Sequence, residues 1–354
     1  MVFSKIGNSL GGGIRSIISM KIKFSHEFEE LVDMENLIDG WQEFLKGKKN
    51  KKDVQEFQFH LMDNILSLHR DLINGNYKHG GYECFKINDP KPRDIHKALV
   101  SDRLLHHAVY LKLYPFFDKT FIEDSFSCRI GKGSHKAINR FREFSYIVSK
   151  NHTKICWTLK CDIKKFFASI NQTILIKILD ERISDKKIVG LLKEIIGSFN
   201  SGRKEIGLPL GNLTSQLFSN VYMNEFDQFV KHKLKIRHYI RYADDFVILS
   251  EDKNYLKKII PVIGDFLQNN LSLTLHPDKI YIKTLYSGVD FLGWFNFPHH
   301  KTLRNKTKNR MLAKIKENKN LKTLSSYIGL LKHGSTQKVK DKVLKLYVSG
   351  GWEL

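Results

Sequence analysis

Cysteine and proline are scarce in this 354-residue chain, acidic side chains are outnumbered by basic ones, and no long apolar run is present. The cysteines show no C-x-x-C spacing, so the sequence does not indicate a zinc site. We expect them to be buried free thiols in a reducing compartment: Cys84, Cys128, Cys156 and Cys161. Because a membrane-spanning helix needs about 20 apolar residues, no such helix and no membrane partner are expected.

The shortage of acids leaves a strongly basic chain. Lys and Arg number 59 against 37 Asp and Glu, which gives a formal net charge of +22. A charge of this size attracts polyanions, and the attraction weakens as salt is added. With 12% aromatic residues, the composition favours a folded nucleic-acid-binding protein over a membrane-surface protein. The length predicts two or three subdomains.

The first residues show no targeting segment. They contain one Lys, one Arg and a run of glycines at 11–13, and they lack the apolar centre and cleavage site of a signal peptide. We therefore expect residues 1–20 to be a flexible lead-in, with the true start at either Met1 or Met20.

The first half of the chain predicts helices interrupted by one hairpin. Apolar residues recur at helical spacing over about 28–72, broken by a basic turn at 46–52 that is either a solvated loop or a phosphate contact. A β-hairpin arm is expected over 82–95 and a helix over about 102–117. A Gly-rich turn at 131–134 then precedes another helix.

The second half predicts strands interleaved with helices. A compact apolar run at 156–161 ends at Asp162, and a strand over 273–282 is expected to carry Lys279. Between and beyond them, helices are expected over 173–181, 214–234, 255–271 and, in a very basic stretch, about 305–316, 321–332 and 337–348. This order predicts an α+β or α/β sheet covered on one face.

Two adjacent carboxylates, Asp244 and Asp245, lie between short β-favouring runs in the segment HYIRYADDFVIL. This pattern predicts a hairpin with the acids at its tip. Adjacent aspartates repel each other unless a cation offsets their charge, and Mg²⁺ is usually held by one or two carboxylates plus substrate phosphates. An isolated Asp-Asp pair is more often a solvated turn, so the metal interpretation depends on the rest of the chain.

Four segments, CDIKKFFASI, GLPLGNLTSQ, RYADDFVIL and LTLHPDKI, follow one another along the chain. Their order and intervals resemble motifs A, B, C and D of a reverse transcriptase palm. PKPRDIHKALVSDRLLHHA and FIEDSFSCRIGKGSHKAI are similar to finger motifs of bacterial and group II intron-like reverse transcriptases, and GVDFLGW to the primer grip. The resemblance extends from about Phe44 to the C-terminus.

The resemblance implies an α+β right-hand polymerase with a helical thumb. Its fingers would be residues 21–155, its palm 156–298 with a finger-like insertion at about 171–206, and its thumb 299–354. The implied activity is RNA-directed DNA synthesis by a cytoplasmic protein that is bacterial or phage-encoded. The partners would be an RNA template, a DNA or RNA primer and dNTPs.

The same resemblance assigns the reacting groups. Asp162, Asp244 and Asp245 would hold two Mg²⁺ ions, for which Mn²⁺ is a substitute, because paired divalent ions stabilise the attacking and leaving oxygens of phosphoryl transfer. Lys279 would protonate the departing pyrophosphate as a general acid, or it is a plain surface lysine.

Other positions would contact the nucleotide. Lys91 and Arg93 would clamp the triphosphate, with Arg93 favoured for its bidentate geometry. Phe167 would stack under the incoming sugar and exclude a 2′-hydroxyl, with Phe166 in the core by strand alternation, although the two are interchangeable on sequence alone. Motif B supplies three further substrate contacts: Leu210, Gly211 and Gln216.

The thumb would follow the template–primer backbone with basic side chains. The candidates are Lys301, Arg304, Lys306, Lys308, Arg310 and Lys314.

Motif B also indicates a subtype. Leu210 stands where most polymerases carry Gln, and GNLTSQ and SYIGLLKHGST resemble the reverse transcriptases of diversity-generating retroelements. That resemblance implies error-prone copying at template adenines, a structured cognate RNA and a small basic accessory protein. The alternatives are an antiviral defence-associated or retron-like reverse transcriptase and, outside enzymes, a catalytically silent RNA-binding scaffold.

Overall fold

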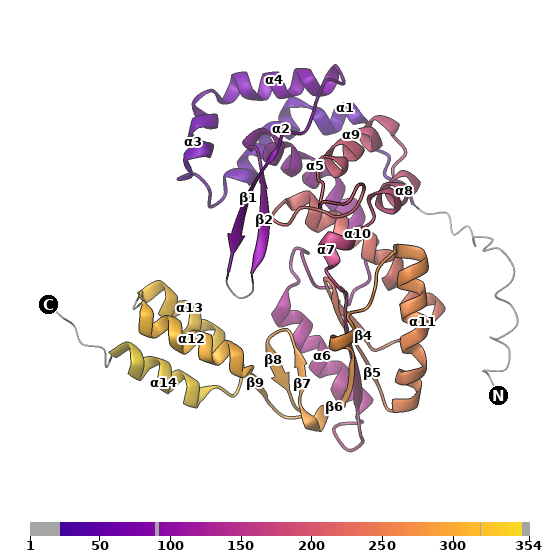
Figure 1. The fold of residues 1–354 in the computed structure, drawn as a ribbon, viewed down its shortest axis with the longest axis vertical. Coiled ribbons are helices and arrows are strands. Elements are labelled where there is room, and N and C mark those ends of the chain that lie inside the picture. The colour runs from indigo at the N-terminus through magenta and orange to yellow at the C-terminus, as the bar shows by residue number, and fades with distance from the viewer. Residues whose placement is uncertain (1–21, 89–91, 319, 349–354) are drawn as a thin grey trace, which may run out of the picture.

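The computed structural model describes residues 22–88, 92–318 and 320–348. Helical fingers lie at one end, a sheet-containing palm below them, and a helical thumb to one side (Figure 1). The architecture is therefore the α+β right hand that the sequence predicts. No helix in these ranges is long and apolar enough to cross a membrane.

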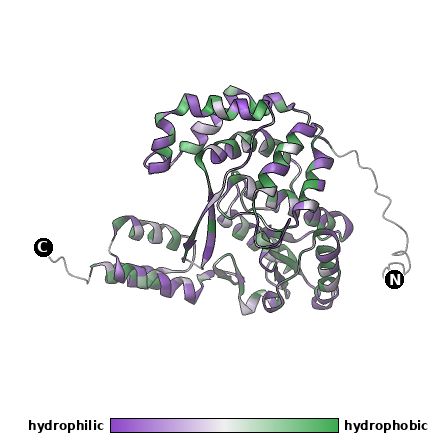
Figure 2. Cartoon of the chain, turned by 45° about the horizontal axis from the view of Figure 1, so that its top comes forward, coloured by the Kyte–Doolittle hydropathy of each residue, from purple (hydrophilic) through white to green (hydrophobic). Residues whose placement is uncertain are grey.

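The fingers are built around one central helix, α5 (Val100–Asp118). Apolar faces of the neighbouring helices pack on it, and in Figure 2 green apolar and purple polar residues alternate along these helices. Gly40 allows one close approach, since a Cβ there would lie 2.9 Å from the Ala108 backbone nitrogen. The surrounding helices are α1 (Phe28–Val32), α2 (Met34–Leu45), α3 (Lys52–Phe59) and α4 (Leu61–Ile73).

A two-stranded arm, β1 (Tyr82–Ile87) with β2 (Arg93–Ala98), projects from the fingers as the sequence predicts (Figure 1). Three helices complete the junction between fingers and palm: α7 (Phe166–Ser169), α8 (Gln172–Arg182) and α9 (Lys186–Gly197).

The palm sheet is antiparallel, with strand order β4-β5-β3-β6. Its strands are β3 (Trp157–Asp162), β4 (Tyr239–Tyr242), β5 (Asp245–Ser250) and β6 (Tyr281–Thr284). The helices against it are α6 (Ser134–Val148), α10 (Leu213–Gln228) and α11 (Lys253–Leu271).

Both faces of the palm sheet are covered, whereas the sequence predicted one. Phe246 and Ile248 pack with residues of α10 and α11, and the alternate residues Val247 and Leu249 pack with Phe141 of α6. The strands are accordingly apolar on both sides, as doubly covered sheets are. The prediction missed α6 as a partner because it is distant in sequence from β5.

Two predicted elements differ from the structure. The strand expected over 273–282 is broken: Lys279 ends the 3-10 turn η2 (Pro277–Lys279), and β6 begins only at Tyr281, since Pro277 cannot donate a ladder hydrogen bond. The helix expected to reach Leu234 leaves α-geometry after Gln228 and continues as a π-helical turn, η1 (Phe229–Lys233).

The predicted burial of all cysteines was also wrong. Cys156 and Cys161 are buried, whereas Cys84 on the arm and Cys128 in a loop are exposed. An exposed two-stranded arm has no core on its outer face, which explains Cys84.

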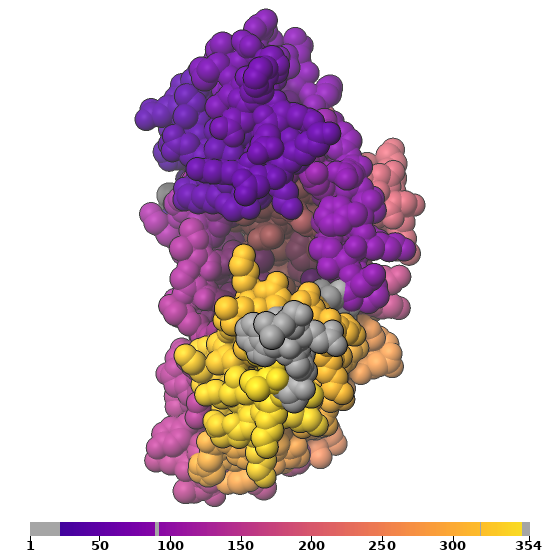
Figure 3. All heavy atoms as spheres, turned by 90° about the vertical axis from the view of Figure 1, so that its left-hand side faces the viewer, coloured from indigo at the N-terminus to yellow at the C-terminus, as the bar shows by residue number. Residues whose placement is uncertain are grey.

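A small sheet joins palm to thumb. β7 (Val289–Phe291), after the turn η3 (Leu285–Ser287), pairs with β8 (Trp294–Asn296), and β8 pairs with β9 (Lys301–Leu303), so pairing crosses the boundary expected at 298/299. The thumb helices match the prediction closely: α12 (Asn305–Glu317), α13 (Leu321–Leu331) and α14 (Gln337–Val348). Seen from the thumb side, a hollow lies between fingers and thumb (Figure 3).

Candidate active site

Three acids meet at one end of the palm sheet. Asp162 ends β3 and lies directly opposite Asp245, the first residue of β5. Asp244 lies in the preceding turn with Ala243, and we call residues 243–244 the acidic turn. Antiparallel pairing of β3 with β5 thus brings together residues that are far apart in sequence.

The carboxylates repel one another in a partly desolvated place. The pKa of Asp245 is raised to about 6, chiefly by burial; Lys160 opposes the rise, and the charges of Asp162 and Asp244 add to it. Burial and then Asp162 raise the pKa of Asp244, against the opposing charges of Lys279 and Arg93. The nearby cations therefore do not fully offset the effects of burial and of repulsion between the carboxylates on these pKa values.

Two lysines partly offset the negative charge of the acids. Lys279 Nζ donates to Asp162 Oδ1 at 2.7 Å, so Lys279 reaches the acids although it lies on a turn rather than a strand. Lys160 Nζ lies 3.1 Å from Asp245 Oδ1 as an ion pair. Sequence reasoning missed Lys160. It lies two residues before Asp162 in the same strand, so strand alternation places both side chains on one face of the sheet.

The acids suit a hard divalent cation. Carboxylate oxygens are the ligands that Mg²⁺ and Mn²⁺ prefer. Asp245 Oδ1 is buried with Lys160 as its ion-pair partner, and burial followed by the neighbouring carboxylates raises the pKa values of Asp244 and Asp245, which a bound cation would offset. Over the described ranges, no three His, Cys, Asp or Glu side chains already stand in metal-binding geometry. The donor chemistry fits the predicted ions, and the present side-chain arrangement is one in which Lys279 holds Asp162.

The finger arm is joined to the motif B turn beside this cluster. His96 N donates to the Leu210 carbonyl at 2.9 Å, and Asn212 Nδ2 donates to the His96 carbonyl at 3.2 Å. Between them Gly211 has φ +111°, and a Cβ there would lie 2.8 Å from Ile95 Cγ2. The turn therefore extends the edge of β2, which requires glycine at this point.

This junction determines where Arg93 lies. Arg93 begins β2 and is exposed, and its charge lowers the pKa of Asp244 against the effect of burial, so the arm brings a cation toward the acids. Lys91, the other predicted triphosphate contact, lies outside the described residues.

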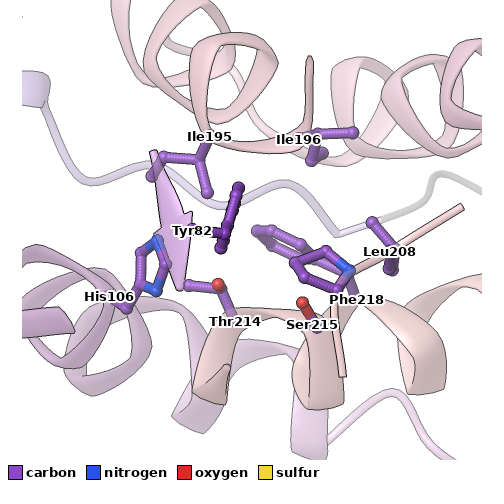
Figure 4. Close-up of a pocket in the computed structure, with 9 residues that line it drawn as sticks. Tyr82, His106, Ile195, Ile196, Leu208, Thr214, Ser215 and Phe218 are labelled. Carbon is purple, nitrogen blue, oxygen red and sulfur yellow. The ribbon is translucent and has the colours of Figure 1, made fainter. Parts of the chain in front are cut away.

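Behind the motif B turn lies a small space lined in part by Leu208 and Pro209 (Figure 4). Tyr82, Ile195, Thr214 and Phe218 surround it together with His106, and Tyr82 Oη lies 2.7 Å from Ser198 Oγ. Burial lowers the pKa of His106 to about 3, so this imidazole is neutral at ordinary pH. With no cationic side chain in its lining, the space is packing rather than a phosphate site.

The remaining nucleotide candidates lie near the same junction. Phe166 is buried and Phe167 is partly exposed, as expected, but both belong to the short helix α7, so strand alternation was the wrong reason. Leu210 and Gln216 are partly exposed and Gly211 is exposed.

The thumb candidates divide into inward and outward residues. Lys301 is only 7% exposed and its Nζ lies 5.0 Å from the centre of the Trp294 ring, an environment that does not favour the predicted backbone contact. Pairing of β9 with β8 directs it inward. Arg304 donates to the Asp290 carboxylate. Along α12, Lys306 and Lys314 are exposed, and Lys308 and Arg310 are partly exposed.

Comparisons with known proteins agree with these motifs. The family model "Reverse transcriptase (RNA-dependent DNA polymerase)" matches residues 87–295, from the end of β1 to β8. Protein YkfC of Escherichia coli (strain K12) is 25% identical over 279 residues, covering 67% of this chain and 72% of YkfC. The group II intron-encoded protein LtrA of Lactococcus lactis subsp. cremoris is 22% identical over 280 residues, covering 59% and 45%.

The putative COX1/OXI3 intron 2 protein of Saccharomyces cerevisiae is 22% identical over 277 residues, which is 61% of this chain but 30% of the yeast protein. The chain thus spans less than a third of that relative and under half of LtrA. Among solved structures, apo telomerase from Candida tropicalis has a TM-score of 0.48 at 14% identity, over 69% of this chain and 60% of its own. The family match spans more than half of the sequence, and the chain belongs to the reverse transcriptase family.

Proposed function

We propose that this protein is an RNA-directed DNA polymerase that extends a primer along an RNA template. The observation that carries the proposal is the meeting of Asp162, Asp244 and Asp245 at one end of the palm sheet, beside a cationic arm. A catalytically silent scaffold would have no reason to keep three mutually repelling acids in a desolvated place.

The three acids would hold two divalent ions, preferably Mg²⁺, with Mn²⁺ as a substitute. When bound, these ions supply the positive charge that stabilises the attacking primer oxygen and the leaving pyrophosphate. Lys279 Nζ donates a hydrogen bond to Asp162, and an N–H donor at this place suits a general acid for the pyrophosphate. Arg93 on the arm would meet the triphosphate, a role in which a planar guanidinium binds two oxygens at once.

The partly exposed Phe167 ring would lie under the incoming sugar and exclude a 2′-hydroxyl. The buried Phe166 supports it, with ring centres 5.4 Å apart. RNA template, DNA or RNA primer and dNTPs would meet in the hollow between fingers and thumb (Figure 3). The exposed and partly exposed basic residues of α12 suit a phosphate backbone.

Primer extension on RNA tests this function directly. Replacing Asp244 with Asn keeps the shape and removes a ligand charge, so extension should collapse by orders of magnitude while template binding stays nearly unchanged. Asp265→Asn, an exposed acid on α11, is the matched control for the same charge change. Near-normal extension by Asp244→Asn would disprove the assignment.

We further propose that the polymerase belongs to a diversity-generating retroelement and miscopies template adenines. The support is Leu210, which offers only packing where many polymerases place a hydrogen-bonding Gln. Losing a directional hydrogen bond should loosen nucleotide selection by about 1 to 3 kcal/mol. A structured cognate RNA and a small basic accessory protein would then be its partners.

Sequencing cDNA from the native protein and from Leu210→Gln, made on one RNA, separates the subtypes. The native product should carry dense substitutions at adenines, and Gln should reduce them. A uniformly accurate native product would leave the defence-associated or retron-like alternative.

A further inference from the structure

Beneath the acidic turn, the Arg241 side chain is completely buried. A buried guanidinium is costly unless each N–H group finds an acceptor. Here each does. Nε donates to Asp227 Oδ1 at 2.8 Å, and Nη2 donates to Asp227 Oδ2 at 2.7 Å and to Ser125 Oγ at 3.1 Å. Nη1 donates to the Asn220 side-chain oxygen at 3.3 Å and to the Ala243 carbonyl at 3.1 Å.

The guanidinium is fixed by other elements before it reaches the turn. Asp227, on α10, is also fully buried and accepts a second hydrogen bond from Tyr239 Oη at 2.7 Å. The two-pronged contact with Asp227 sets the plane of the Arg241 side chain. The Arg241 backbone is held as well, since its N donates to the Asp124 carbonyl and its carbonyl accepts from Phe126 N, both at 3.0 Å.

The contact with Ala243 is the one that bears on the chemistry. Ala243 has φ +56°, a left-handed conformation that a residue with a Cβ rarely adopts. Its carbonyl belongs to the planar peptide unit that also contains the Asp244 nitrogen. The hydrogen bond to this carbonyl therefore fixes the orientation of the peptide group between Ala243 and Asp244, which precedes both acids.

A purely structural ion pair would not need this arrangement. Apolar residues of similar volume commonly stabilise a core as well as a buried pair does. Neutralising Asp227 would require only Nε and Nη2, yet Nη1 turns away from Asp227 toward Asn220 and the acidic turn. The network links α10 and the 124–126 segment to the one peptide that precedes both acids.

We propose that Arg241 is a positioning residue for polymerisation: through the Ala243 carbonyl it keeps the carboxylates of Asp244 and Asp245 beside Asp162. The proposal rests on the proposed function. It makes Arg241 responsible for the order of the acidic turn, which is measurable without nucleic acid.

The test compares Arg241→Lys with Ser125→Ala in the full chain. Lysine keeps a cation against Asp227 but has no planar fork to reach Ala243 at the same time, whereas Ser125→Ala removes one acceptor of the same guanidinium away from the turn. Three quantities are measured after thermal melts confirm folding: amide hydrogen exchange in 243–246, affinity for Mn²⁺ alone by electron paramagnetic resonance, and kcat and KM for primer extension.

Arg241→Lys should exchange faster at the turn, bind Mn²⁺ more weakly and lose about 10- to 100-fold in kcat with KM for template–primer little changed. Ser125→Ala should match the native protein in all three. Native exchange and Mn²⁺ affinity in a folded Arg241→Lys would overturn the proposal, and so would equal losses in Ser125→Ala.

If lysine prevents folding, the triple variant Arg241→Met, Asp227→Leu, Tyr239→Phe removes the charges together and keeps an apolar core. It should fold with a loosened turn and low kcat, and a folded triple variant with native exchange and kcat would overturn the proposal. Failure of the proposed function shows itself separately, as a native protein that binds Mn²⁺ but does not extend a primer.

Discussion

The palm and the thumb are both rich in charge, but they hold it in opposite ways. In the palm, Arg241, Asp227 and Lys160 are buried, and each contacts specific atoms through its place on a strand or on α10. In the thumb, Met311 and Ile315 face a small core while basic residues such as Lys306 lie outside. The proposed function of the palm therefore depends on the position of each charge, whereas that of the thumb depends on the number of exposed basic residues.

The largest expected effect comes from removing one charge in the palm. Asp162→Asn keeps the size of the side chain but removes the charge that Lys279 contacts and that repels Asp244. We expect primer extension to fall by several orders of magnitude. Lys314→Gln on α12 also changes the charge by one unit, in the opposite direction, and should reduce extension only slightly. Comparable losses in both variants would contradict the distinction.

A smaller effect is expected from geometry alone, without any charge change. In Gly211→Ala the new Cβ would lie 2.8 Å from Ile95 Cγ2 at φ +111°, so the arm must move away from the motif B turn. Because a displacement of about 1 Å can cost about a hundredfold, kcat/KM for dNTP should fall by roughly tenfold or more.

Gly293→Ala is the matched control for this prediction. Gly293 also has positive φ, +89°, but a Cβ there meets nothing within 4 Å. It should lower stability by about 1 kcal/mol through backbone strain and leave kcat/KM nearly native. Steady-state kinetics beside thermal melts separate the two outcomes.

The thumb should respond to salt rather than to position. Neutralising Lys306 and Lys308 to Gln should flatten the log–log salt dependence of template–primer binding by about one to two units. Lys301→Met, which keeps an aliphatic stem over Trp294, should leave the slope unchanged. Fluorescence anisotropy titrations at several salt concentrations measure both, and a slope change in Lys301→Met alone would reverse the assignment.

The smallest expected effect is a pH dependence of the free energy of unfolding, caused by one buried histidine. His106 has a pKa near 3 in the folded chain because of burial, against 6.5 when exposed. Below pH 6.5 the unfolded chain takes up a proton that the folded chain refuses, so stability falls as pH is lowered from 6.5 toward 3.

Between pH 6.5 and 5 the loss in unfolding free energy attributable to His106 should reach about 1.6 kcal/mol. Urea unfolding of the native protein and of His106→Gln at both pH values measures it, with the exposed His232→Asn as control. Identical pH dependence in all three proteins would show that His106 titrates normally.

Local patterns made much of the palm and thumb predictable. Helical spacing located the thumb helices to within a residue or two, and β-favouring runs around Asp244 and Asp245 located the acidic hairpin. Turn chemistry was less reliable, because Pro277 moved Lys279 from a strand to a 3-10 turn while its ammonium still reached Asp162.

What escaped prediction depends on tertiary register. Nothing near Arg241 in sequence indicates Asp227 or Ser125 as its partners, since they meet only after α10 and the 124–126 segment pack against β4. Lys301 looked like one of several equivalent surface lysines until its strand paired and turned it toward Trp294.

One residue of the small joining sheet touches both halves of the hand. The Asp290 carbonyl accepts from Tyr281 Oη of β6 at 2.9 Å, and its carboxylate accepts from Arg304 at the start of α12. Because β8 pairs with both β7 and β9, a three-stranded antiparallel sheet connects the thumb to the palm. Backbone pairing of three strands and the two contacts of Asp290 therefore fix the direction in which α12 leaves the palm.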